Sequence, residues 1–244
     1  MTGVVHPDEI AGQRDNGADV RVTFDEHLTQ RVVRIPPGRW QPGERGVAQE
    51  ILYVVSGNGS LVLDGDQHEL TPGTGAYVAP GEAYEVDADD ELVLVSVIAP
   101  RDRATASGKR KVTVRFDEQP ELPASPERSF RYLVNQDAGC FDVTQFVGIV
   151  RPSRAPPHSH TYDEVGYIVE GEGFAHIEGE SVPLRPGSCF HLAPGQLHCI
   201  ENSGSTTMRI LGVFHPSGDP SKHEVATSAP DRSSNPPESR QGGD

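Results

Sequence analysis

The chain has 244 residues and a formal net charge of −15 at pH 7. That length is enough for two domains of about 100 residues each. The acidity would repel nucleic-acid phosphates, so it excludes a nucleic-acid partner and is interpreted as a solubility feature. No apolar run is long enough to cross a bilayer and no signal peptide is recognisable, so we expect no membrane partner. Cys140, Cys189 and Cys199 lack paired metal spacing and fit a reducing cytoplasm.

Short apolar segments between Gly and Pro turns predict an all-β protein, because helical periodicity is almost absent. Jelly-roll barrels would cover the exposed edges of such strands and would enclose a small-molecule cavity. The segment 130–134 is either a strand exchanged between barrels or the first strand of the second barrel. Other predicted strands cover residues 32–33, 51–55, 61–63, 92–98, 146–150, 165–169 and 208–214.

The domain boundaries follow from composition. Residues 1–19 are predicted to be an N-terminal extension, 20–100 a first barrel, and 113–216 a second barrel. Between them, residues 101–112 include the basic run RDRATASGKR and are interpreted as a solvated linker. Residues 217–244 are rich in Ser, Pro, Asp, Glu and Gly and are predicted to be disordered.

The strongest chemical signal is a set of four potential metal ligands: His158, His160, Glu164 and His198. His158 and His160 are two residues apart, so both side chains of a strand would point to one face. Glu164 has the same parity, and His198 follows a Pro-Gly turn that would bring a neighbouring strand back to the same place. Imidazoles suit iron, nickel, copper and zinc, and the carboxylate widens the choice toward manganese.

Two segments of the chain resemble the two sequence motifs of the cupin superfamily, namely HSHTYDEVGYIVEG and GSCFHLAPGQLHCIEN. The resemblance implies that His158, His160, Glu164 and His198 bind one divalent transition metal. Iron, manganese or nickel is favoured, and zinc is a further choice. It also implies a range of reactions that includes dioxygenases, decarboxylases, isomerases and lyases, together with proteins that only bind a ligand.

The same pattern occurs a second time, 114 residues earlier, so the chain resembles a bicupin. EILYVVSGNG matches EVGYIVEGEG, and Glu164 falls on Glu50. The histidines do not repeat: His158, His160 and His198 fall on Glu44, Gly46 and Tyr84. One carboxylate cannot hold a transition metal, so the first barrel is predicted to be structural. In the alternative interpretation, Glu44, Glu50 and Tyr84 line a metal-free pocket for a polar ligand.

Tyr162 and His191 are the candidate catalytic residues. Tyr162 shares the parity of the ligands and would offer a phenol as acid or hydrogen-bond donor. His191 and His176 lie on strands predicted to flank the site, but strand parity leaves open whether each faces the pocket or the outside. Arg154 precedes the first ligand and would either bind a substrate carboxylate or be solvated.

Four protein ligands leave one or two positions open on a five- or six-coordinate ion, and such openings are typical of catalytic metals. We therefore expect a metal-dependent enzyme for a small oxygenated organic molecule, with dioxygenase- or decarboxylase-like chemistry favoured over isomerisation. The alternatives are a binding or sensor protein without turnover, and a structural metal site. A homo-oligomer is possible, although two barrels in one chain would also allow them to pair within it.

Overall fold

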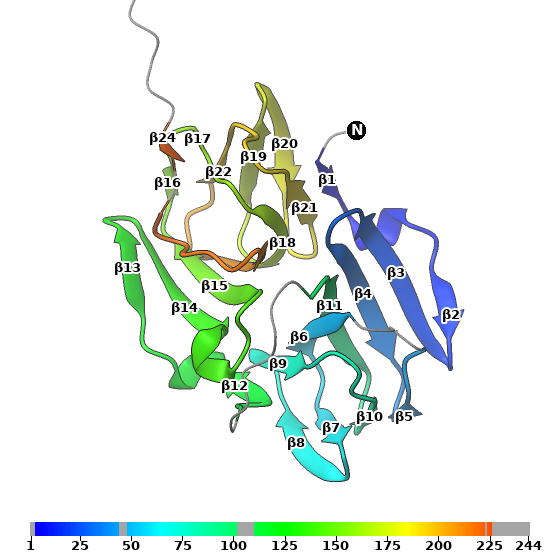
Figure 1. The fold of residues 1–244 in the computed structure, drawn as a ribbon. Coiled ribbons are helices and arrows are strands. Elements are labelled where there is room, and N and C mark those ends of the chain that lie inside the picture. The colour runs from blue at the N-terminus through cyan, green and yellow to red at the C-terminus, as the bar shows by residue number, and fades with distance from the viewer. Residues whose placement is uncertain (1–2, 44–47, 102–109, 223, 226–244) are drawn as a thin grey trace, which may run out of the picture.

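The computed structural model describes residues 3–43, 48–101, 110–222 and 224–225. It is an all-β protein of two barrels, and each barrel is built from two antiparallel sheets (Figure 1). In the described residues the helices are three short 3₁₀ turns, at Pro7–Glu9, Phe116–Glu118 and Gln136–Ala138. The predicted fold class, two jelly-roll barrels in one chain, is confirmed.

The N-terminal barrel (mostly blue to cyan in Figure 1, with β11 and β12 green) pairs a seven-stranded sheet with a four-stranded sheet. The larger sheet has the order β12-β9-β6-β11-β4-β3-β2 and contains β2 (Gln13–Asp15), β3 (Ala18–Asp25), β4 (Thr29–Ile35), β6 (Gln49–Ser56), β9 (Thr74–Val78), β11 (Leu92–Ala99) and β12 (Thr113–Arg115). The smaller sheet has the order β5-β10-β7-β8 and contains β5 (Gly38–Trp40), β7 (Gly59–Leu63), β8 (Asp66–Leu70) and β10 (Tyr84–Ala88).

The C-terminal barrel (mostly green to orange) repeats this plan. Its larger sheet has the order β1-β21-β18-β23-β15-β14-β13 and contains β1 (Val4–Val5), β13 (Leu122–Ser125), β14 (Arg128–Val134), β15 (Thr144–Val150), β18 (Asp163–Glu170), β21 (Cys189–Leu192) and β23 (Met208–His215). Its smaller sheet has the order β20-β19-β22-β17-β24, with β16 also paired to β22, and contains β16 (Ser153–Arg154), β17 (His158–Ser159), β19 (Gly173–Ile177), β20 (Glu180–Leu184), β22 (His198–Asn202) and β24 (Glu224–Val225).

The repeated glycines predicted from the sequence explain how both barrels turn after β6 and β18. Gly57 and Gly171 have φ of 85° and 86°, a region that L side chains rarely adopt. A Cβ at Gly57 would lie 2.3 Å from the Glu91 carbonyl oxygen, and one at Gly171 would lie 2.7 Å from Met208 Cα. Only glycine therefore permits this turn to pass so close to the neighbouring strand in either barrel.

Two short strands cross from one barrel to the other. β1 precedes the N-terminal barrel but pairs with β21 of the C-terminal barrel. β12 precedes the C-terminal barrel but pairs with β9 of the N-terminal barrel. The boundary at residue 113 is corrected accordingly, because 113–115 complete the sheet of the first barrel. By contrast, β14 pairs with β13 and β15 of its own barrel, so segment 130–134 is not exchanged.

A two-fold-like pair of hydrogen bonds ties the barrels together. Gln30 Nε2 donates to the Gly166 carbonyl at 3.1 Å, and Gln145 Nε2 donates to the Leu52 carbonyl at 3.1 Å. Leu52 and Gly166 are themselves 114 positions apart. Around these bonds one apolar cluster continues from β6 and β11 into β15, β18 and β23. The pairing of barrels considered from the sequence is thus present within a single chain.

Both ends of the chain differ from the boundaries predicted from composition. β2 and the start of β3 lie inside the proposed extension 1–19, yet they form the edge of the N-terminal sheet. Residues 217–222 have defined structure, and β24 pairs with β17, so the prediction of disorder is wrong for this part of 217–244. The rest of that tail, like residues 102–109 of the linker, lies outside the described residues. In the described part of the chain, no helix has the length and apolar character needed to span a membrane.

Candidate metal centre

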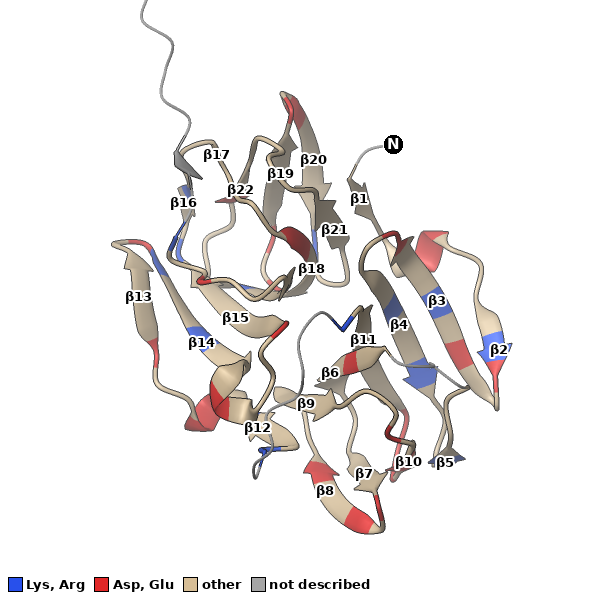
Figure 2. Ribbon diagram, in the orientation of Figure 1, with Lys and Arg blue, Asp and Glu red and all other residues tan. Residues whose placement is uncertain are grey.

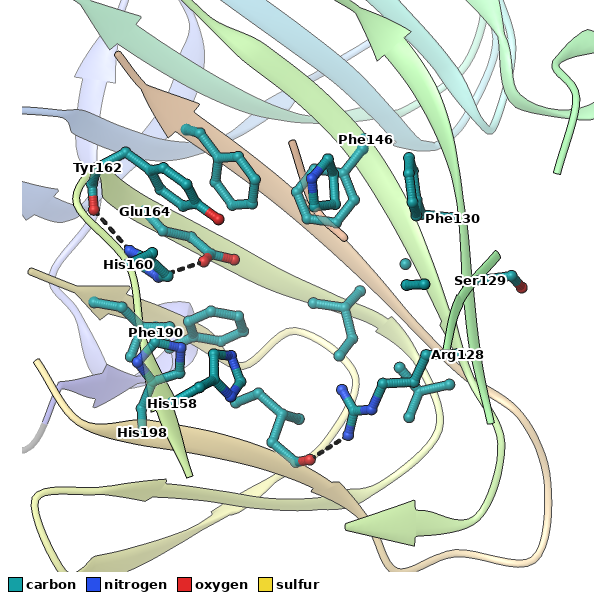
Figure 3. Close-up of a pocket in the computed structure, with 18 residues that line it drawn as sticks. Arg128, Ser129, Phe130, Phe146, His158, His160, Tyr162, Glu164, Phe190 and His198 are labelled. Carbon is teal, nitrogen blue, oxygen red and sulfur yellow. Dashed lines mark hydrogen bonds and ion pairs between the residues drawn. The ribbon is translucent and has the colours of Figure 1, made fainter. Parts of the chain in front are cut away.

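The predicted ligands line one pocket of the C-terminal barrel, between its two sheets (Figure 3). β18 carries Glu164, β22 begins with His198, and β17 begins with His158, whose Cα pairs with that of His198. His160 follows β17 directly. His160, Glu164 and His198 are each at most 8% exposed. The pocket encloses a cavity of about 120 Å³, far more than the 10–15 Å³ or so that one water needs on this measure.

The structure brings three of the four predicted ligands into one group. One ligand atom from each of His160, Glu164 and His198 lies within 4.8 Å of the others. His158 lies outside this group, although its ring packs against His198 with 4.5 Å between centroids. His158 lines the same pocket, so it remains the predicted fourth ligand.

Hydrogen bonds to backbone carbonyls orient all three imidazoles in the same way. Nδ1 lies 2.9 Å from the Pro156 carbonyl in His158, 2.8 Å from that of Tyr162 in His160, and 2.8 Å from that of Gln196 in His198. A carbonyl oxygen only accepts, so each Nδ1 carries the proton, and in the neutral ring Nε2 keeps its lone pair. Metal-bound histidines typically have such a partner on the nitrogen that does not bind the metal.

His160 shows directly why a cation fits this place. Its Nε2 is buried and lies 3.0 Å from Glu164 Oε2, but it makes no well-aligned hydrogen bond to any described residue. In the neutral ring, two lone pairs would face each other here. Burial lowers the pKa of His160, and the adjacent Glu164 carboxylate more than reverses this effect, so the pKa lies above its ordinary value. The site thus favours a positive charge between these two atoms, which either a proton or a metal ion provides.

Aromatic rings form a continuous wall beside the ligands. The Tyr162 ring stacks on His160 on one side and on Phe214 on the other, with 4.1 Å between centroids in both cases. Phe214 continues to Phe146 at 4.8 Å, and Phe146 to Phe130 at 6.2 Å. Burial raises the pKa of Tyr162 well above its usual range, so its phenol keeps its proton. Tyr162, a predicted catalytic residue, therefore lines the pocket with a protonated phenol, and its catalytic role stays a prediction.

His191, the other predicted catalytic residue, lies outside the pocket. Its Nε2 is 2.5 Å from Asp163 Oδ1, and its ring lies 5.6 Å from Phe24 of the N-terminal barrel. Neighbouring side chains of a strand point to opposite faces, and here Phe190 and Leu192 occupy the pocket side. The prediction that His191 lines the pocket is therefore corrected: it faces the other barrel.

Two further candidates also point away from the pocket. His176 bonds to Ser181 Oγ at 2.7 Å and to Glu201 Oε2 at 2.8 Å on the outer face of its sheet. Arg154 is exposed and lies 3.9 Å from the same Glu201 carboxylate. Of the two interpretations weighed for Arg154, the solvated arginine is confirmed.

Sequence reasoning missed the cation that does line the pocket, Arg128 at the start of β14. Its guanidinium crosses to the other sheet of the barrel and donates to the Ile200 carbonyl at 2.5 Å. Arg128 lies outside both sequence motifs. The sequence signal for it was the alternation of Arg128, Phe130 and Tyr132, which on a strand would put the three side chains on one face. Phe130 and Phe146 line the pocket on the same side (Figure 3).

In the N-terminal barrel an arginine binds the glutamate that corresponds to Glu164. Arg31 Nη2 lies 2.7 Å from Glu50 Oε1, and the Ser96 hydroxyl donates to the same oxygen at 2.5 Å. Tyr84, which replaces His198, packs edge-on against Trp40 in a buried apolar cluster. These contacts support a structural role for this barrel. Glu44, the third residue of the alternative polar pocket, lies outside the described residues.

Comparisons with known proteins agree with this architecture. Residues 31–98 and 147–214, together more than half of the chain, match the family model for the cupin domain. The chain is 39% identical over 58 residues to an oxalate-binding protein of Thermotoga maritima, covering 23% of this chain and 48% of that protein. It is 35% identical over 98 residues to an L-ectoine synthase of Mycolicibacterium gilvum, covering 39% of this chain and 73% of that protein.

Among solved structures, a mutant of Bacillus subtilis oxalate decarboxylase superposes with a TM-score of 0.72 at 13% identity. That match covers 88% of this chain and 77% of the decarboxylase chain, and it shows a shared fold. The chain spans about half the length of the oxalate-binding relative, so the activity of that protein is not transferred by the match. The family model, the paired barrels and the His/Glu/His group lead to one conclusion: this chain belongs to the cupin family and is a bicupin.

Proposed function

We propose that the C-terminal barrel is the catalytic centre of a metal-dependent enzyme for a small oxygenated organic molecule. The observation that carries the proposal is the common orientation of three imidazoles, whose Nδ1 atoms are held by backbone carbonyls while a buried carboxylate lies beside Nε2 of His160. His160, Glu164 and His198, with His158 as fourth ligand, would hold one divalent transition metal. Such an ion would polarise a carboxylate or carbonyl of the substrate and support electron transfer.

Manganese and iron are the preferred ions. Three neutral nitrogens and one carboxylate suit several first-row ions, and the similar fold of Bacillus subtilis oxalate decarboxylase is described with Mn(II) centres. Decarboxylase-like chemistry is favoured, with dioxygenase-like chemistry next. In either case the aromatic wall of Tyr162, Phe214 and Phe146 would exclude water, and the Tyr162 phenol would donate a hydrogen bond to the bound substrate.

A second candidate is a protein that binds a small carboxylic acid without converting it. The similarity to an oxalate-binding protein supports it, as does the position of His191, which leaves Tyr162 as the one predicted acid–base residue in the pocket lining. The two candidates differ in one measurement: the enzyme would convert a bound carboxylic acid to product, and the binding protein would release it unchanged.

The first experiment measures the metal content of the purified protein by mass spectrometry. The two barrels provide a matched pair of variants, Glu164→Gln and the equivalent Glu50→Gln. We expect close to one equivalent of metal in the wild type and in Glu50→Gln, and a strong loss in Glu164→Gln and in His160→Ala. Equal metal content in Glu164→Gln and Glu50→Gln would exclude the proposed centre.

The second experiment follows the metal-loaded protein with small carboxylic acids. Release of carbon dioxide without oxygen uptake would indicate a decarboxylase, and oxygen uptake would indicate a dioxygenase. Saturable binding without either product would favour the binding protein. Manganese and iron are loaded separately, so that each outcome can be assigned to one ion.

A further inference from the structure

We propose that Arg128 is an anion anchor, and that the natural ligand of the C-terminal pocket is an organic acid whose carboxylate binds this guanidinium while another oxygen faces the metal ligands. The inference deepens the proposed function and rests on it only for the metal end of the pocket. Arg128 lies on the opposite side of the pocket from His160 and Glu164 (Figure 3).

Arg128 lacks the carboxylate partner that most of the described arginines have, and unlike Arg14 and Arg151, which also lack one, it is not exposed. Its guanidinium donates a hydrogen bond from Nη2 to the Ile200 carbonyl, and within the described residues it takes part in no ion pair. Elsewhere in the chain, β3 carries both a basic and an acidic position (Figure 2), and Arg21 and Arg131 pair with Asp19 and Glu121. Arg128 therefore retains donors for a ligand.

Burial makes this arrangement informative. The guanidinium is half-buried among apolar side chains, and this burial lowers the pKa of Arg128. A positive charge in such a place costs free energy unless a counter-ion lies beside it. A bound anionic ligand would supply that counter-ion. A planar guanidinium also matches a carboxylate through two parallel hydrogen bonds.

The net charge inside the pocket favours the same ligand class. A divalent ion on the His/Glu group and the charge of Arg128 would outweigh the single carboxylate of Glu164, although the whole chain carries −15. This local excess of positive charge would attract a small anion. Between the two charged ends the walls are apolar, formed by Phe130, Phe146 and Ile200, which suits a short carbon skeleton.

Only the barrel that keeps the metal histidines has this arginine. Arg128 pairs with Val150, the last residue of β15. The equivalent strand of the other barrel is β4, which ends at Ile35. Asp19 pairs with Arg34, and this antiparallel register, extended by one residue, puts Ala18 beside Ile35. The N-terminal barrel thus has a buried alanine where the C-terminal barrel has Arg128. The cation accompanies the ligand set, as expected of a residue that serves the same site.

The test is calorimetric titration of the manganese-loaded protein with oxalate, malonate and succinate, and with uncharged succinamide. We expect at least one dicarboxylate to bind and succinamide to bind far more weakly. Arg128→Gln should weaken binding of the dicarboxylate about ten- to hundredfold, because a hydrogen-bonded charge pair is lost. Arg128→Lys should give an intermediate affinity. Arg154→Gln, which removes an exposed arginine outside the pocket, should bind like the wild type.

Equal dicarboxylate affinities of the wild type and Arg128→Gln would overturn the inference. So would binding of succinamide as tight as that of succinate, or no binding of any dicarboxylate by the wild type. The titration is repeated on protein stripped with a chelator, where the effect of Arg128 on carboxylate affinity should persist. If the proposed metal site is wrong, the purified protein contains no metal. If the proposed role of Arg128 is wrong, the wild type and Arg128→Gln bind the dicarboxylate with the same affinity.

Discussion

The guanidinium of Arg31 lies 2.7 Å from the carboxylate of Glu50, whereas Glu164, the corresponding glutamate of the other barrel, lies 3.0 Å from Nε2 of His160. Glu50 is fully buried, and 14% of the side chain of its partner Arg31 is exposed. Each barrel therefore stabilises the charge of a buried glutamate, and the two barrels do so with different groups. The N-terminal barrel neutralises it with an arginine, and the C-terminal barrel surrounds it with imidazoles suited to a metal.

Removing this arginine should destabilise the N-terminal barrel. Arg31→Met leaves Glu50 buried without its cation, which typically costs about 3–5 kcal/mol of the free energy of unfolding. Denaturant unfolding measures the change, and the double variant Arg31→Met/Glu50→Gln should recover much of it. Arg39→Met, which removes an exposed ion pair with Asp87, should unfold like the wild type. An unchanged midpoint for Arg31→Met would show that the pair is not needed.

Transplanting the arginine should abolish the metal site without unfolding the barrel. Strand registers match Arg31 and Ser96 with Phe146 and Gly212, since each pair lies opposite on neighbouring strands. In Phe146→Arg/Gly212→Ser, the new groups should bind Glu164 as Arg31 and Ser96 bind Glu50. We expect metal content to fall to background while the circular dichroism spectrum is retained.

The single variant Gly212→Ser serves as the control for this transplant. A Cβ at position 212 would lie 2.4 Å from the Phe146 ring, so we expect the single variant to have a lower free energy of unfolding than the wild type. Full metal occupancy in the folded double variant would contradict the interpretation that arginine substitutes for the ion.

Tyr162 should matter for turnover and not for metal content. Tyr162→Phe keeps the stack on His160 and Phe214 but removes the hydroxyl. If the phenol acts on the substrate, kcat should fall about 10²- to 10⁴-fold with one equivalent of metal still bound. Tyr167→Phe changes a buried tyrosine at the contact between barrels and should leave kcat unaltered. An equal loss in both variants would point to packing instead of chemistry.

The contact of His191 with Asp163 should make stability depend on pH. The hydrogen bond to Asp163 raises the pKa of His191, against the opposing effect of burial. A raised folded-state pKa adds stability below the unfolded value of about 6.5 and loses it as the pH rises through the folded value. The free energy of unfolding of the wild type, relative to His191→Gln, should therefore be largest at acidic pH and shrink toward alkaline pH. A constant difference from about pH 5.5 to 8.5 would contradict this assignment.

Much of the site could be predicted because its ligands alternate along strands and because the two barrels repeat in sequence. The shift of 114 positions aligns Glu50 with Glu164 and exposes the missing histidines of the first barrel. Strand parity and the turn before His198 were enough to expect convergence, and the structure joins His160, Glu164 and His198. His191 could not be placed in this way, because period-two alternation does not say which face of a strand meets the pocket.

The sequence by itself predicted the all-β class, the two barrels and three residues that the structure brings together, His160, Glu164 and His198, since local patterns with fixed spacing encode them. Only the tertiary structure decided that Arg128 reaches Ile200, 72 positions away, and that Arg31 neutralises Glu50. It also decided that β1 and β12 each complete the sheet of the other barrel. These contacts depend on which strands lie beside or opposite one another in the folded barrels, and contacts between distant strands leave no spacing in the chain from which they could be read.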